Sequence, residues 1–143
     1  MKRIKNKKAY FNYNLGDRVE AGIVLSGDEI KSIRLGKVSL IGSYGRILVD
    51  KSGNPELWLV GAHIPSSAGD PTRSRKLLVH HHEINKLIGQ TAQKGLTLVP
   101  TKIYFKKGRA KVEIAASRGR KTHDKRELLK KRDLERESRK PIS

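Results

Sequence analysis

Short stretches in which apolar and polar residues alternate constrain this chain more than any other feature. In residues 18–25, apolar side chains would share one face, and Arg18, Glu20 and Gly22 would share the other. A period of two is typical of a strand with one buried face. Four further segments are predicted as strands: 44–49, 56–64, 96–105 and 109–116. The last two would form a hairpin around Lys107 and Gly108, with Pro100 marking an edge position or a bulge.

Two short helices are predicted among these strands. Ser26, with Glu29 three residues later, forms a capping-box pattern, and Gly36 would end that helix. A second helix is predicted over residues 80–94. Because the helices do not alternate regularly with the strands, a parallel βαβ sheet is not expected. The expected fold is mainly β, a small, partly open antiparallel barrel of about six strands with two or three short helices.

Charge indicates the class of partner. The chain has 143 residues, which fits one domain, and a formal net charge of +18. Such an excess of cations is typical of proteins that bind nucleic acid, through contacts that weaken with salt. The absence of cysteine excludes disulfide scaffolds and cysteine–zinc sites, and no apolar run is long enough to span a membrane. The basic N-terminus lacks an apolar signal core, so we expect a cytoplasmic protein with no membrane partner.

The C-terminal residues differ from the rest. We divide the chain into a barrel, residues 1–117, and a basic tail, residues 118–143. The tail has only four hydrophobic side chains, too few to offset the entropy cost of ordering it. Acid-first pairs such as Glu127 and Lys131 nevertheless favour a helix. We therefore expect a tail that is mostly disordered when free and becomes ordered on RNA.

Patterns of catalytic or metal-binding residues are not found. The acids are scattered, without an Asp-x-Asp pair or a zinc-protease motif. The run His80, His81 and His82 would point in directions about 100° apart on a helix, so the rings could not converge on one ion. We expect no enzyme activity, no metal and no cofactor.

Several residues are candidates for RNA contact. Arg73, Arg75 and Lys76 lie just before the second predicted helix, where cations and free N–H groups can bind phosphate; the alternative is a solvated loop. Glu20 could accept from a base amino group or a ribose hydroxyl, although from the residues alone an ion pair with a lysine is favoured. The seven aromatic residues are few for stacking along a single strand, which favours a folded RNA.

Five segments in this order together resemble the SsrA-binding protein family, also called small protein B. They are residues 19–38 with Glu-Ala-Gly, 70–78 with Asp-Pro-Thr-Arg-Ser-Arg-Lys-Leu-Leu, 94–100, 104–113, and 118–126 with His-Asp-Lys-Arg. The resemblance covers residues 8–136. It implies a barrel of the oligonucleotide-binding type with flanking helices.

The resemblance also implies a function. Such proteins bind transfer-messenger RNA near the elbow of its tRNA-like part and serve trans-translation, which rescues stalled bacterial ribosomes. The tail would enter the empty decoding centre and mRNA channel, against the 16S rRNA of the small subunit. Elongation factor Tu would be an indirect partner, through the RNA, and we expect a monomer. The alternative function is a generic ribosomal or single-strand RNA-binding module; an RNA-processing enzyme is a more distant one.

Family RNA-contacting positions correspond to particular residues of this chain. In the body they are Glu20, Leu78 and His80, so the resemblance favours an RNA contact for Glu20 over the ion pair. In the tail they are Arg118, Gly119, Arg120, Lys121, His123, Asp124, Lys125 and Arg126. The loop at residues 64–69 is shorter than the family pattern and lacks its aromatic stretch, which places contacts made by that loop in question.

Overall fold

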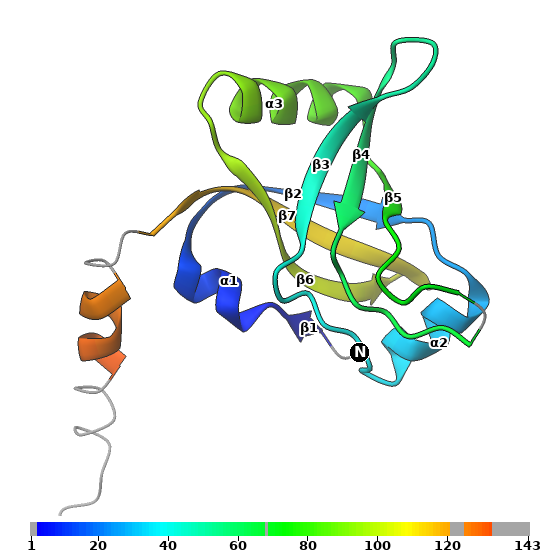
Figure 1. Cartoon of the computed structure of the whole chain (residues 1–143), viewed down its shortest axis with the longest axis horizontal. Coiled ribbons are helices and arrows are strands. Elements are labelled where there is room, and N and C mark those ends of the chain that lie inside the picture. Colours follow the sequence, from blue (N-terminus) through cyan, green and yellow to red (C-terminus); the bar gives the residue numbers. More distant parts are fainter. Residues whose placement is uncertain (1–2, 68, 121–124, 133–143) are drawn as a thin grey trace, which may run out of the picture.

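The computed structural model describes residues 3–67, 69–120 and 125–132 (Figure 1). The strands are β1 (Ile4–Lys5), β2 (Tyr13–Ile23), β3 (Tyr44–Val49), β4 (Pro55–Val60), β5 (Arg75–Leu78), β6 (Thr97–Lys106) and β7 (Arg109–Gly119). The helices are α1 (Lys7–Asn12), α2 (Gly27–Arg34) and α3 (His81–Ala92).

Six strands pair into an antiparallel ring. The order of neighbouring strands is β6-β3-β4-β5-β2-β7, and the last strand, β7, pairs with the first, β6. The short strand β1 also pairs with β6, outside this ring of six. Two joints of the ring are narrow: β3 meets β6 only at Gly45 and Leu98, and β2 meets β5 over two residue pairs. The partly open barrel of about six strands predicted from sequence is thus confirmed.

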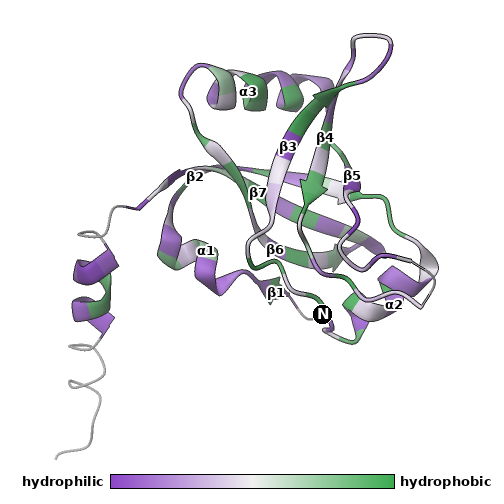
Figure 2. Ribbon diagram, viewed as in Figure 1, coloured by the Kyte–Doolittle hydropathy of each residue, from purple (hydrophilic) through white to green (hydrophobic). Residues whose placement is uncertain are grey.

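The core lies inside this ring. Val19 and Ala21 of β2 point inward, as their alternation predicts, and Glu20 between them points outward. Figure 2 shows hydrophobic and hydrophilic residues mixed along the barrel strands. The core cluster also includes one face of α2, through Ile33, and of α3, through Ile84 and Leu87. Both helices therefore cover openings of the barrel.

Local signals predict the start of α2 correctly. The Ser26 N–H donates to Glu29 Oε1 at 2.9 Å, and the Glu29 N–H donates to Ser26 Oγ at 3.3 Å, which completes the capping box. Gly36, with φ of 74°, lies just beyond the helix end. Lys107 and Gly108 both have positive φ in the turn between β6 and β7, and the register shifts between Pro100 and Lys102, so the predicted hairpin and bulge are confirmed.

Several features differ from the sequence prediction. Strand β5 lies just before the second predicted helix, where no strand was predicted, and α1 and β1 were not predicted at all. Strand β4 ends at Val60 rather than at residue 64. Strand β7 continues to Gly119, pairing with Tyr13, so the barrel ends two residues later than the predicted boundary at 117. The extra length of β7 depends on long-range pairing with β2, which local patterns do not encode.

Part of the tail is helical. Residues 125–132 form a helix that lies apart from the barrel, on the side of α1 (Figure 1). This agrees with the helix-favouring pair of Glu127 and Lys131. The other expectation, that the tail has no fixed structure before it binds RNA, stays a prediction.

Candidate nucleic-acid interface

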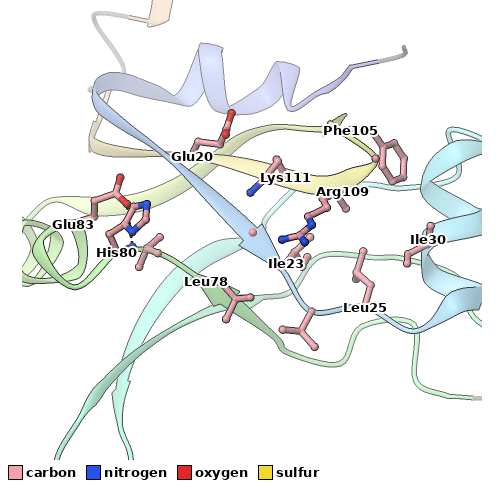
Figure 3. A pocket seen from close by; sticks show the side chains of 15 residues that line it. Glu20, Ile23, Leu25, Ile30, Leu78, His80, Glu83, Phe105, Arg109 and Lys111 are labelled. Carbon is pink, nitrogen blue, oxygen red and sulfur yellow. Dashed lines mark hydrogen bonds between the residues drawn. The ribbon is translucent and has the colours of Figure 1, made fainter.

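An open groove of about 680 Å³ crosses the barrel where β2, β5 and the β6–β7 hairpin meet (Figure 3). Three residues predicted as RNA contacts, Glu20, Leu78 and His80, line it together. They lie up to 60 positions apart in sequence, and the ring of strands brings them to one surface. The groove is bordered by Glu83 of α3 on one side and by Ile30 of α2 on another.

Apolar side chains form much of the groove surface. Leu78, at the end of β5, is 54% exposed although it is a large aliphatic residue. It pairs in register with Gly22 of β2, whose missing side chain leaves space above the strand. Ile23 and Phe105 line the same groove (Figure 3). Apolar and aromatic surface of this kind suits contact with a base or ribose face.

Glu20 supplies an acceptor at the edge of this surface. Its Oε2 accepts a hydrogen bond from the Tyr104 hydroxyl, and its Oε1 is 3.5 Å from Lys106 Nζ. The hydrogen bond from Tyr104 lowers the pKa of Glu20, burial acts in the opposite direction, and Lys106 and Lys111 lower the pKa further. Glu20 is therefore an ionised, partly exposed acceptor in a strongly basic protein.

His80 caps α3 at the other end of the groove. Its backbone N–H donates to Glu83 Oε1 at 3.0 Å, which begins the helix. Its imidazole is stacked on that of His82, with ring centres 5.7 Å apart and planes inclined by 6°. The ring pair presents donors and a flat face together, both of which RNA bases use.

Two cations of the groove were not among the predicted contacts. Arg109 and Lys111 begin β7 and line the groove opposite Leu78 (Figure 3). Their spacing of two places both side chains on the same face of the strand, and the alternation with apolar residues predicts that this is the outer face. The missing information was that β7 lies beside β2, which pairs Lys111 with Gly22 and places it near Glu20.

The predicted cluster of Arg73, Arg75 and Lys76 is not a single phosphate site. Arg75 has none of its surface exposed, so the prediction that it contacts RNA is wrong for this structure. Alternation along β5 turns Arg75 inward and Lys76 outward, where Lys76 Nζ pairs with Glu56 at 2.7 Å. Arg73 remains half exposed and pairs with Glu29. None of the three lines the groove.

Arg75 instead organises the loop that leads into β5. Its Nε donates to Glu29 Oε2 at 2.7 Å, and its other nitrogens donate to three carbonyls, those of Ala62, Ile64 and Pro71. Burial acts to raise the pKa of Glu29, but hydrogen bonds from Ser26, Arg73 and Arg75 outweigh it and lower the pKa to about 2. This buried ion pair joins α2 to the strand that carries Leu78.

The predicted tail contacts fall into three groups. Arg118 and Gly119 end β7, and Arg120 follows, its N–H donating to the carbonyl of Asn12 at 2.7 Å. Lys125 and Arg126 lie in the helix of residues 125–132. The others lie outside the described residues: Lys121, His123 and Asp124.

The tail helix contacts α1 through cations and an aromatic ring. Lys125 Nζ is 5.9 Å, and the Arg132 guanidinium carbon 5.8 Å, from the centre of the Phe11 ring. Each such contact is worth about 0.5–1 kcal/mol at an exposed site. Each of these two contacts is weak by itself.

Neither a metal centre nor a membrane span emerges from the part of the chain that the structure describes. Within residues 3–67, 69–120 and 125–132, no three His, Cys, Asp or Glu side chains gather where they could hold a metal ion. Of the helices in those ranges, none has the length and apolar character to cross a membrane.

The family model described as SmpB protein matches residues 3–143. The chain belongs to the SmpB protein family. Two relatives, both called SsrA-binding protein, support this assignment. That from Thermoanaerobacter pseudethanolicus is 51% identical over 139 residues, covering 93% of this chain and 86% of the relative. That from Oleidesulfovibrio alaskensis is 51% identical over 144 residues, covering 96% and 90%. The resemblance recognised in the sequence is thus confirmed.

A solved structure agrees with this family assignment. A protein in the structure described as "tmRNA-SmpB: a journey to the center of the bacterial ribosome" is 43% identical to this chain, with a TM-score of 0.69. The match covers 84% of this chain and 85% of that one. The family's barrel and the one described here are therefore the same fold.

Proposed function

We propose that this protein binds transfer-messenger RNA at its tRNA-like part and brings it to stalled ribosomes for trans-translation. The observation that carries the proposal is the convergence of Glu20, Leu78 and His80 in one groove. Family membership and the SmpB match support the same function. The role is that of an adaptor rather than a catalyst, in the cytoplasm, without a cofactor.

The barrel would bind the RNA by shape and charge together. Apolar groove residues such as Leu78 would contact ribose or base faces, while Arg109 and Lys111 bind phosphates. A formal charge of +18 adds long-range attraction. Elongation factor Tu would join the complex through the RNA, and the protein would act as a monomer.

The tail would provide the second contact, in the ribosome. Residues 118–143 would enter the decoding centre and mRNA channel, where message is absent in a stalled complex. Lys125 and Arg126, already helical, would bind rRNA phosphates, and His123 would stack on or hydrogen-bond a base. Because message and tail would compete for one path, only an empty channel would admit the tail.

A competition assay tests the proposed function. Labelled transfer-messenger RNA bound to the full chain is displaced with ordinary tRNA or an unrelated RNA at matched salt. We expect each competitor to displace the label at least about tenfold less effectively, since non-specific binding lacks the fitted contacts. Equal displacement by all three RNAs would instead indicate the generic RNA-binding module.

A truncation tests the tail. It should end after Arg120 rather than after Ser117, because β7 extends to Gly119 and Arg120 bonds to Asn12. The shortened protein is expected to bind transfer-messenger RNA as the full chain does but to support no tagging of peptides on stalled ribosomes. Normal tagging by this variant would contradict the proposed tail function.

A further inference from the structure

Tyr104 contacts Glu20 from across strand β7. It pairs in register with Lys111 of β7, which in turn pairs with Gly22 of β2, so Tyr104 and Glu20 lie in adjacent rows on the outer face. Only 9% of Tyr104 is exposed, yet its hydroxyl reaches the Oε2 atom of Glu20. A nearly buried aromatic residue thus ends in a hydrogen bond at the edge of the groove.

The tyrosine is held firmly as a donor. The guanidinium carbon of Arg3 is 5.5 Å from the centre of its ring, and Lys102 Nζ is 5.8 Å away. Burial raises the pKa of Tyr104 well above its usual range, and the Glu20 and Glu113 carboxylates raise it further. The hydroxyl therefore keeps its proton at neutral pH and donates to Glu20.

The surroundings of Glu20 differ from those of the neighbouring carboxylate. Glu113 lies directly opposite Glu20 on β7 and accepts from Thr101 Oγ1 at 2.5 Å, with Arg18 and Lys102 each 3.6 Å away. Among the described residues, Glu20 forms an ion pair with Lys106, whose Nζ is 3.5 Å from Oε1. Its close partner is thus a neutral hydroxyl, which orients the carboxylate without cancelling its charge.

This arrangement leaves Glu20 with acceptor capacity. A carboxylate has about four lone-pair sites, of which Tyr104 uses one and Lys106 approaches another. The side chain is 36% exposed and lines the groove. An incoming donor can therefore bind without displacing the tyrosine.

We propose that Tyr104 is a positioning residue for RNA recognition, holding the Glu20 carboxylate so that it accepts from a ribose 2′-hydroxyl or a base amino group. This inference rests on the proposed function and deepens it. A tight ion pair would neutralise the carboxylate, whereas the hydroxyl fixes its direction and keeps it available. Tyr104 itself does not touch the RNA.

A double-mutant cycle tests the role. Binding of the full chain to transfer-messenger RNA is measured for Tyr104→Phe, Glu20→Gln and the double variant, with Tyr44→Phe as control. Tyr104→Phe keeps the ring and its cation contacts, and we expect binding about tenfold weaker, the size expected for a hydrogen bond to a charged group. The double variant should bind like Glu20→Gln alone, because the hydroxyl acts only through that carboxylate. Tyr44, on β3 outside the groove, should tolerate the same change.

A second measurement does not depend on RNA. The Glu20 carboxyl is titrated by NMR in free wild-type protein and in Tyr104→Phe. Loss of the hydroxyl removes the largest cause of the lowered pKa of Glu20, so the Glu20 titration should move to higher pH. As pH falls, Glu20 gains its proton and RNA binding should weaken. In Tyr104→Phe this weakening should begin at a higher pH than in the wild type.

The outcomes separate this inference from the proposed function. The positioning role alone would be overturned if the wild type binds the RNA tightly and Tyr104→Phe changes its affinity by less than twofold. It would also be overturned if the affinity losses of the two single variants add up in the double variant. An unshifted Glu20 titration would overturn it as well. Wild-type protein that does not prefer transfer-messenger RNA would overturn the proposed function and this role with it.

Discussion

At the scale of single residues, the fully buried pair of Glu29 and Arg75 decides the geometry around the groove. A buried guanidinium is costly unless every donor is satisfied, and here a carboxylate and three carbonyls satisfy it. The pair connects α2, the loop before β5, and β5 itself. The buried Arg75 thereby fixes the start of β5, and Leu78, three residues later on the same strand, lines the groove.

Removing the charge of Glu29 should destabilise the fold. Glu29→Gln leaves the Arg75 guanidinium buried without its counter-charge, and we expect a loss of about 3 kcal/mol in the free energy of unfolding. Glu56→Gln, which breaks the exposed pair with Lys76, is the matched control and should cost at most about 1 kcal/mol. Urea unfolding of both variants measures the difference; equal losses would contradict the structural role of Glu29.

The same pair predicts a pH dependence. The pKa of Glu29 is lowered from 4.5 to about 2 in the folded protein, so its stabilisation is present above about pH 4.5 and is lost as pH falls toward 2. The stability difference between wild type and Glu29→Gln should therefore shrink between those values. Urea unfolding at about pH 6 and about pH 3 measures it. A difference that stays constant would show that the carboxylate does not carry the effect.

At the scale of elements, the barrel closes where β3 approaches β6. Gly45 is the one residue of β3 in register with β6, and a Cβ there would lie 2.9 Å from the Cβ of Leu98. Both atoms are fixed by strand backbones, so the crowding could be relieved only by separating the strands. Glycine at this position therefore allows the ring to close.

Gly45→Ala should weaken the barrel. We expect a loss of about 1–3 kcal/mol in the free energy of unfolding, as for overpacking in a core. Gly89→Ala is the matched control, because nothing lies within 4 Å of a Cβ at that position of α3. Replacing a helical glycine there should stabilise the protein by about 0.5–1 kcal/mol. Thermal unfolding gives both values; a neutral Gly45→Ala would contradict the close approach.

Local signals in the sequence explain part of this fold. The capping box of Ser26 and Glu29, the alternation around Glu20, and the turn at Lys107 and Gly108 each depend on neighbours in the chain, and each is confirmed. The inward turn of Arg75 was not predictable, because it depends on a carboxylate 46 positions away. An arginine between Ser74 and Lys76 resembles a solvated loop until β5 is known to pair with β4 and β2.

The groove was predictable only in part. Glu20, Leu78 and His80 were identified from the family resemblance, and their convergence needed the barrel topology. Arg109 and Lys111 were predicted to face outward, but the position of Lys111 near Glu20 was not predicted, since strand order is not visible in local alternation.

At the scale of the whole molecule, positive charge should make RNA binding depend strongly on salt. Arg109→Ala with Lys111→Ala removes two groove cations, and the slope of log K against log salt should become shallower by about 2. Arg46→Ala with Lys51→Ala removes the same charge from β3 and the turn after it, outside the groove. That control should change the slope much less. Equal changes would mean that the groove is not where phosphates bind.

The most direct test of the central claim locates RNA on the surface of the protein. The tRNA-like part of transfer-messenger RNA is titrated into the isotope-labelled full chain, and backbone NMR signals are followed. The account predicts the largest changes at Glu20, Leu78, His80 and Lys111, which line the groove. Changes confined to the β3–β4 hairpin or to α1, with the groove signals unmoved, would contradict it.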